Sequence, residues 1–234
     1  MGRLRILSDS SRPFRDRQEA GRLLASELAE LRGEAPVVLG IPRGGIIVAR
    51  ELARALGGEL DIILARKLRA PVQPELALGS VAEDGKVFLN ELVVRGLGVS
   101  STYIEEEKAR QLAEIRRRSE LVRQVRPRVP LESRVVVVTD DGVATGATTR
   151  AAVWAVRLGR PRRLMAAIPV GPRDTLADLA GDVDDMLCLR APPLFGAVGQ
   201  YYQQFYPVED EEVLEILREE QGRSGRRSGP AESQ

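Results

Sequence analysis

Four consecutive valines, Val135 to Val138, restrict the fold of this 234-residue chain more than any other segment. A strand that is apolar at every position is typical of a parallel sheet that is covered on both faces. Further short apolar runs recur along the chain and are separated by segments of helical periodicity. With the strand that holds the valines, they span 35–42, 60–66, 133–141, 163–170 and 183–189. The alternation predicts an α/β fold, with a doubly wound, mostly parallel sheet flanked by helices.

Helical patterns occupy the intervals between these runs. The expected helices span 16–32, 46–56 and 102–125, and two more follow the runs at 133–141 and 163–170. Asp16 followed by Glu19 is typical of a capping box at the start of the first helix, and Thr102 with Glu105 plays that part in the long third helix. The basic triplet 116–118 of the long helix is interpreted as a solvated face in preference to a binding patch.

The domain organisation is expected to be simple. Residues 1–220 are predicted to form a single domain, in which the N-terminal helix and residues 190–220 make a small hood. A hairpin is predicted around Glu83-Asp84-Gly85. Residues 221–234 lack apolar side chains and are predicted to be a disordered tail.

Composition removes several classes of function. Histidine is absent, which excludes Ser-His-Asp and Cys-His catalysis, histidine-ligated zinc and histidine acid–base chemistry. A formal net charge of +1 argues against a nucleic-acid or membrane-surface binder. No transmembrane run or signal peptide is recognised. The only cysteine, Cys188, stands in an apolar run and is interpreted as a buried hydrophobic residue; with no internal disulfide, a cytoplasmic location is expected.

Two adjacent carboxylates, Asp140 and Asp141, follow the valine strand, at the strand end where ligands bind in parallel sheets. The turn that comes next, 142–149, leads into a helix start, where backbone amides and the helix dipole favour an anion. Thr145 and Thr148 add hydroxyl donors. The alternative is an ordinary turn with a capping threonine. A ribose 5-phosphate explains both features, because carboxylates accept hydrogen bonds from its hydroxyl groups while the amides hold its phosphate.

The segment Val135 to Thr149 resembles the phosphoribosyl pyrophosphate (PRPP) motif of type I phosphoribosyltransferases: a hydrophobic strand, two acidic residues and a turn ending T-G-x-T. The resemblance implies the fold of that family and a ribose diol held by Asp140 and Asp141. It places the 5′-phosphate in the turn made by Val143, Ala144, Thr145, Gly146, Ala147 and Thr148. Over roughly residues 14–218 the chain also resembles a less-characterised bacterial phosphoribosyltransferase-domain group, whose acceptor is generally unassigned.

The pyrophosphate of PRPP needs a second anion site, and the glycine-rich turn 40–45 is expected to provide it. Two glycines, Gly44 and Gly45, allow the backbone to approach an anion closely, and Arg43 adds a permanent charge. The alternative is a glycine-rich turn with a surface arginine. The resemblance implies a non-proline cis peptide bond, expected at Arg43-Gly44.

Basic residues end the next predicted strand. Arg66 and Lys67 are neighbours and should point to opposite faces, and the resemblance favours Lys67 as the pyrophosphate contact. The segment 68–75 is then expected to be a flexible loop that closes over the reacting centre, with Arg69 as a further contact. The alternative is a solvated surface loop.

The resemblance implies an enzyme that transfers the 5-phosphoribosyl group from PRPP to an acceptor and releases pyrophosphate. Asp140, Asp141, Arg43 and Lys67 are the expected catalytic residues. Mg²⁺ is the expected cofactor, held through PRPP without a direct protein ligand. A homodimer is implied by the family. The competing hypothesis is a non-catalytic regulator that senses PRPP or a nucleotide on the same fold; a phosphatase with an aspartate nucleophile fails on the spacing of the aspartates.

The acceptor is not determined by the sequence. Ala144 stands where enzymes for 6-oxopurines carry an aspartate, which argues against that branch, and the composition of the flexible loop argues against an orotate enzyme. Phe195, Tyr201 and Tyr202 are candidates for stacking on a nucleobase in an acceptor pocket. Packing of a C-terminal extension, or a dimer contact, is the favoured interpretation of these aromatic residues.

Overall fold

The apolar runs of the sequence all contain strands in the computed structural model, which describes residues 2–71, 73–74 and 76–227. The strands are β1 (Arg3–Ser8), β2 (Val37–Gly40), β3 (Glu59–Ile62), β4 (Ala65–Arg69), β5 (Ala77–Ala82), β6 (Val87–Leu89), β7 (Val135–Thr139), β8 (Arg163–Val170) and β9 (Asp185–Arg190). The α-helices are α1 (Arg17–Glu27), α2 (Gly45–Leu56), α3 (Glu91–Gly96), α4 (Ser101–Val125), α5 (Ala147–Arg157), α6 (Arg173–Ala180) and α7 (Asp210–Arg227), with 3-10 turns η1 (Ala29–Leu31) and η2 (Val198–Tyr201).

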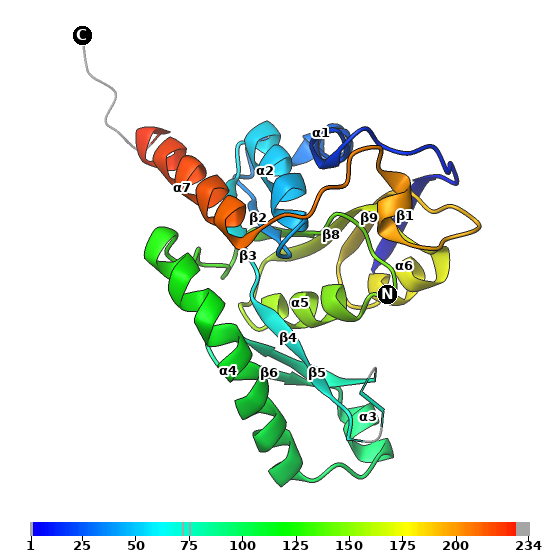
Figure 1. Cartoon of the computed structure of the whole chain (residues 1–234), viewed down its shortest axis with the longest axis vertical. Coiled ribbons are helices and arrows are strands. Elements are labelled where there is room, and N and C mark those ends of the chain that lie inside the picture. The colour runs from blue at the N-terminus through cyan, green and yellow to red at the C-terminus, as the bar shows by residue number, and fades with distance from the viewer. Residues whose placement is uncertain (1, 72, 75, 228–234) are drawn as a thin grey trace.

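Six strands form the main sheet in the order β1-β9-β8-β7-β2-β3, and each neighbouring pair is parallel. Helices α1 and α2 cover one face, and α5 and α6 cover the other (Figure 1). The predicted doubly wound sheet is therefore confirmed. Its layers explain the valine run, because Val135 and Val137 pack into the core beneath α1 and α2, while Val136 and Val138 pack into the core against α5.

A second, antiparallel sheet of order β4-β5-β6 projects from the main sheet, with the long helix α4 beside it (Figure 1). Its β5–β6 turn is the predicted hairpin, and Gly85 adopts a φ of 78° there. Arg123 of α4 joins the two sheets: its guanidinium contacts Asp61 of β3 and Glu83, each at 2.8 Å. Helix α5 contacts β4 and β5 as well as the main sheet, so its N-terminus lies near both sheets.

The segment 60–66, predicted to be one strand, is divided between two sheets. Residues up to Ile62 belong to β3 in the main sheet, and residues from Ala65 belong to β4 in the small sheet. Ile63 and Leu64 connect them and are both buried. Because the apolar pattern continues across the change of sheet, the pattern conceals the break. The first part of the predicted loop 68–75 is likewise strand, up to Arg69, and positions 72 and 75 lie outside the described residues.

Helix starts were predicted with mixed success. Asp16 caps α1 as expected, with its carboxylate accepting a hydrogen bond from the Glu19 amide at 2.7 Å. Helix α4 is capped by Ser100 instead of Thr102, since the Ser100 hydroxyl accepts from the Tyr103 amide at 3.2 Å. Strand β1 and helix α3 were not predicted: β1 is an edge strand with arginines among its six residues, and α3 is short and has no buried side chain.

The C-terminal segments lie against the N-terminal part of the domain. The amide of Phe14 donates to the carbonyl of Tyr201 at 2.8 Å, and Gln203 donates back to Phe14 at 2.8 Å. Helix α7 continues to Arg227, so residues 221–227 are helical where a disordered tail was predicted. Residues 221–227 extend a helix that begins in the glutamate-rich segment before them, although Gly222 and Gly225 are poor helix formers. Positions 228–234 of the predicted tail lie outside the described residues.

Candidate functional site

The carboxyl ends of β2 and β7 bring the glycine turn against the acidic pair. The two strands are neighbours, with Gly40 opposite Thr139. A β-carbon added to Gly44 would lie 1.9 Å from Oδ2 of Asp141, and one added to Gly45 would lie 2.8 Å from Cα of Asp140. Only glycine leaves space at these positions for the carboxylates, so the two strand ends form one site.

The Asp140 carboxyl group has a strongly perturbed pKa. Its carboxylate accepts a hydrogen bond from the backbone amide of Asp141 at 2.8 Å. Burial raises the pKa of Asp140 well above its usual range, and the neighbouring charge of Asp141 raises it further. Strongly perturbed acids of this kind cluster at functional sites. A ligand that donates hydrogen bonds to Asp140 would therefore relieve an unfavourable charge.

Arg17 offsets the charge of Asp141, a role that the sequence did not reveal. Its Nε lies 2.8 Å from Oδ2 of Asp141, and the two side chains are only 9% and 15% exposed. The guanidinium also donates to the carbonyl of Tyr206 at 2.9 Å and lies 3.9 Å above the ring of Phe205. Arg17 is separated from Asp141 by most of the chain, and no local pattern distinguishes it from other arginines. The pairing explains how two adjacent carboxylates are tolerated in one half-buried place.

The turn after Asp141 leads into the start of α5 as predicted. Gly146 occupies the N-cap position with a φ of 76°, and no side chain caps the helix. The first amides of α5 therefore retain the dipole and hydrogen-bonding capacity that favour an anion. Val143 was predicted to contact the phosphate. Instead, its side chain is buried and its backbone amide donates to the carbonyl of Val170 at 2.9 Å. The Ala144 carbonyl accepts a hydrogen bond from Thr175 at 3.0 Å, whereas its side chain is exposed.

A hollow of about 300 Å³ joins this turn to the small sheet. We call it the phosphate-side hollow, and its lining residues are Ala65, Arg66, Lys67, Arg69, Gln111, Thr145, Ala147, Thr148 and Ala151. Three of the six predicted phosphate contacts, Thr145, Ala147 and Thr148, therefore lie around one space with the predicted basic residues Lys67 and Arg69. Its volume is at the lower end of that found for small-molecule sites.

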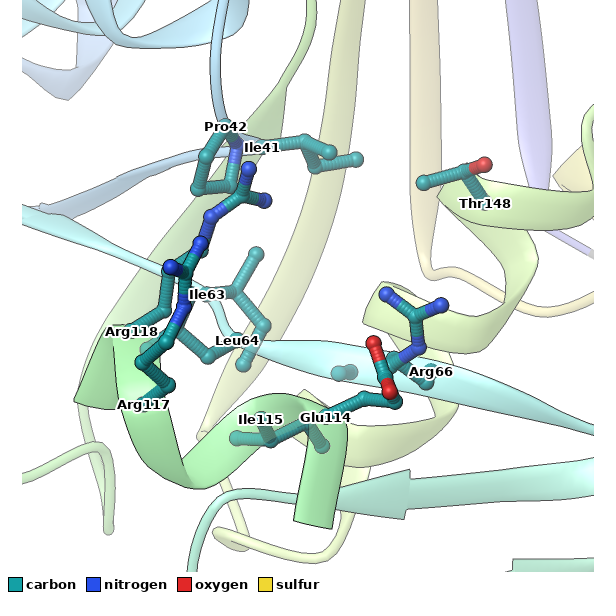
Figure 2. A pocket seen from close by; sticks show the side chains of 11 residues that line it. Ile41, Pro42, Ile63, Leu64, Arg66, Glu114, Ile115, Arg117, Arg118 and Thr148 are labelled. Carbon is teal, nitrogen blue, oxygen red and sulfur yellow. The ribbon is translucent and has the colours of Figure 1, made fainter. Parts of the chain in front are cut away.

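A second hollow, of about 240 Å³, lies next to the first and shares Ala65, Arg66 and Thr148 with it. We call it the α4-side hollow; the remaining lining residues are Ile41, Pro42, Ile63, Leu64, Glu114, Ile115, Arg117 and Arg118. Figure 2 shows Arg66 on β4 across the space from the two α4 arginines. Both Arg66 and Lys67 line the phosphate-side hollow, and of the two only Arg66 also lines the α4-side hollow, so the expectation that only one of them reaches the site stays a prediction.

Arg43 is not brought into either hollow. Its guanidinium lies 3.0 Å from the carboxylate of Glu209, and both side chains are substantially exposed. The cis peptide bond of this turn joins Pro42 to Arg43, one residue before the predicted position at Arg43-Gly44. The backbone of the turn thus lies at the acidic pair as predicted, while the arginine side chain contacts the segment before α7.

The predicted acceptor aromatics pack mainly against protein. Tyr201 is buried, and its hydroxyl donates to the carbonyl of Leu194 at 2.8 Å. Its ring stacks on that of Phe195, with 5.3 Å between the ring centroids. Tyr202 is buried, stacks on Phe205 at 5.1 Å and donates to the backbone carbonyl of Asp141 at 2.5 Å. These contacts contradict a stacking role for both tyrosines in this structure. Phe195 alone of the three lines a further hollow, with Pro172 and Pro193 among its neighbours.

Among the described residues there is neither a cluster of metal ligands nor a membrane-spanning helix. No group of three or more cysteine, aspartate or glutamate side chains among them is placed to hold a metal ion. Within the same part of the chain, no helix combines the length and apolar character that crossing a bilayer requires.

An acidic pair lies beside an uncapped helix start at the carboxyl edge of a parallel sheet, the edge where α/β proteins bind their ligands. The family model for the phosphoribosyl transferase domain matches residues 16–204. The chain belongs to this family.

Individual relatives agree with this assignment. Two Mycobacterium tuberculosis proteins (strains CDC 1551 and H37Rv), each named "Putative phosphoribosyl transferase", are 47% identical over 204 residues. The match covers 87% of this chain but 46% of theirs, so the chain spans about half the length of these curated relatives. The crystal structure of TT1426 from Thermus thermophilus is 48% identical, with a TM-score of 0.85 over 88% of this chain and 98% of that one.

Proposed function

We propose that the chain transfers the 5-phosphoribosyl group of PRPP to an acceptor and releases pyrophosphate. The observation that carries the proposal is the position of Asp140 and Asp141 between the glycine turn and the uncapped start of α5. The carboxylates would accept hydrogen bonds from the ribose hydroxyls, and the first amides of α5 with Thr145 and Thr148 would bind the 5′-phosphate. Arg17 supports this arrangement by holding Asp141 in place.

In the reaction, the bond between ribose C1 and the pyrophosphate oxygen breaks and a bond from C1 to the acceptor forms. Negative charge grows on the departing pyrophosphate, so oriented donors near the glycine turn would lower the barrier. Arg66 lines the α4-side hollow together with Ile41 and Pro42 of the glycine turn, whereas Lys67 and Arg69 line the phosphate-side hollow. Loss of one such donor typically costs about 3–4 kcal/mol of activation free energy.

Mg²⁺ fits this site as a partner of the substrate. It prefers oxygen ligands and retains several waters, so PRPP itself would supply most of its coordination. The carboxylates of Asp140 and Asp141 lie against the glycine turn and would add negative charge beside the ion. When bound, the ion would neutralise charge on the pyrophosphoryl oxygens.

A thermal-shift experiment tests the proposal. PRPP with Mg²⁺ at a hundredfold excess over Kd should stabilise the fold by about 2.7 kcal/mol, and ribose 5-phosphate should also bind. The double variant Asp140→Asn with Asp141→Asn should abolish both effects. Asp178→Asn is a matched control, because Asp178 is exposed on α6. Unchanged melting of the wild-type chain at millimolar PRPP, or full binding by the double variant, would contradict the proposal.

A PRPP- or nucleotide-sensing regulator is the second candidate function. The observation that favours it is the pairing of Arg43 with Glu209, which directs the expected pyrophosphate contact away from both hollows. Pyrophosphate release measured with a panel of nucleobases separates the two candidates. Release with one base supports the transferase, and PRPP binding with no release across the panel supports the regulator.

The acceptor, the location and the assembly of the chain remain predictions from sequence. An acceptor other than a 6-oxopurine is proposed because Ala144 replaces the aspartate of that branch. A cytoplasmic homodimer with no nucleic-acid or membrane partner is proposed from the family resemblance and the near-neutral charge.

A further inference from the structure

The arginines that line the α4-side hollow outnumber its carboxylates. Arg66, Arg117 and Arg118 line it together with a single carboxylate, Glu114. Arg66 is held by a neutral partner, since its Nε donates to Gln111 at 2.9 Å. Arg118 is 3.4 Å from Asp210. The hollow therefore has a net positive lining, which favours an anionic ligand.

Arg117 is the least engaged of these residues. No hydrogen bond or ion pair to Arg117 is found within the part of the chain that the structure describes, and its side chain is exposed. Figure 2 shows it extending from α4, with Arg118, toward the end of the glycine turn at Pro42. The sequence suggested one solvated face for residues 116–118. Successive helical residues are about 100° apart, so three neighbours cannot share a direction, and Arg116 does not line the hollow.

The hollow also lies where the leaving group of the proposed reaction would be. Thr148, at the start of α5, lines both hollows, so a ligand whose 5′-phosphate lies at that helix start can extend into the α4-side hollow. Ile41 and Pro42 on its wall belong to the turn whose glycines contact Asp140 and Asp141. A ribose held by the acidic pair therefore has the phosphate-binding helix start and the basic hollow within reach.

We propose that Arg117, supported by Arg66, binds the pyrophosphoryl group of PRPP and the released pyrophosphate, so that α4 contributes a substrate-binding residue. This inference rests on the proposed function. The planar guanidinium suits the task because it donates two parallel hydrogen bonds to phosphoryl oxygens. Arg117 would then provide the guanidinium contact to pyrophosphate in the α4-side hollow, which Arg43 does not line.

Calorimetric titration of the full chain with magnesium pyrophosphate, PRPP and ribose 5-phosphate tests the proposal. Arg117→Ala should weaken pyrophosphate and PRPP by about tenfold, the loss expected for one charge-assisted hydrogen bond. Ribose 5-phosphate lacks the pyrophosphoryl group, so its affinity should stay within about twofold of wild type. The matched control is Arg116→Ala, which removes the same charge from the next position of α4 and should leave all three affinities unchanged.

The possible results separate this inference from the proposed function. Equal losses in the two variants would indicate a general charge effect and overturn the inference, as would wild-type pyrophosphate affinity in Arg117→Ala. A loss of ribose 5-phosphate binding equal to that of pyrophosphate would assign Arg117 to the other end of the ligand and also overturn it. If the wild-type chain binds neither PRPP nor ribose 5-phosphate, the proposed function itself fails.

Discussion

Replacing Asp140 by asparagine is expected to stabilise the fold while removing ligand binding. The carboxylate is buried beside Asp141, and its pKa is raised by both burial and the neighbouring charge. Asparagine keeps an oxygen that can accept the hydrogen bond from the Asp141 amide, now 2.8 Å long, and removes the charge. At neutral pH the variant should therefore unfold at a higher temperature than the wild type, and PRPP should no longer raise that temperature.

The size of the effect follows from the charges around the site. Unit charges about 4–6 Å apart at an effective dielectric of about 20 repel by about 3–4 kcal/mol, which sets the scale for the Asp140-Asp141 pair. Arg17, 2.8 Å from Asp141, cancels a share of this repulsion, which leaves about 1–2 kcal/mol to be gained. For a chain of this length, that gain corresponds to a rise of about 2–8 °C in melting temperature.

The pH dependence gives the effect a distinct signature. A carboxyl group with a raised pKa in the folded state holds its proton more tightly there than in the unfolded chain. Its stabilising contribution is complete below the unfolded pKa of about 3.9 and is lost as the pH rises toward the folded pKa. The advantage of Asp140→Asn should therefore grow from pH 5 upward and become constant once the folded pKa is passed.

Calorimetric melting curves from pH 5 to 8 measure this advantage, with Asp178→Asn as the control for loss of an exposed charge. Asp178→Asn should show no comparable gain at any pH. A variant that is less stable than the wild type at pH 7, or a difference that does not change with pH, would refute the reasoning about the acidic pair.

Two other substitutions test contacts in the structure, one at the glycine turn of the site and one at the junction of the two sheets. Gly44→Ala should destabilise the fold by about 1–3 kcal/mol and abolish the PRPP-induced shift in melting temperature, because the new β-carbon would lie 1.9 Å from the Asp141 carboxylate. Gly96→Ala, where a β-carbon would meet nothing within 4 Å, is its control, and equal losses in the two variants would contradict this explanation. Arg123→Met should lower the free energy of unfolding in urea by about 3–5 kcal/mol, since it leaves the buried Asp61 without its cation, whereas Glu83 keeps Arg128 at 3.5 Å. A loss below about 1 kcal/mol would mean that the ion cluster does not stabilise the junction of the two sheets.

Much of the fold was predictable because its central strands β2, β7 and β8 are almost entirely apolar. Val135 to Val138 are buried in two cores on opposite faces of the sheet, and such burial leaves a mark in the sequence itself. The break between β3 and β4 left no such mark. Ile63 and Leu64 are buried at the junction, so hydrophobicity continues where the chain changes sheet.

The candidate site likewise contains residues that the sequence could identify and residues that it could not. The Asp140-Asp141 pair and the threonines of the α5 turn are adjacent in the chain, so their spacing carries information about the ligand. Arg17 and the hydroxyl of Tyr202 reach the same turn from distant segments. Which of Arg43, Arg66 and Arg117 is proposed to bind pyrophosphate likewise depended on which guanidinium groups already contact protein side chains.

The sequence by itself determined the parallel sheet, the acidic pair and the turn that leads into α5, because each depends on neighbouring residues and on local backbone geometry. Only the tertiary structure decided that Arg17 neutralises Asp141, that the small sheet and α4 bring basic side chains to the start of α5, and that the two tyrosines pack into the protein. Charges and rings interact through space, and their partners lie far away along the chain.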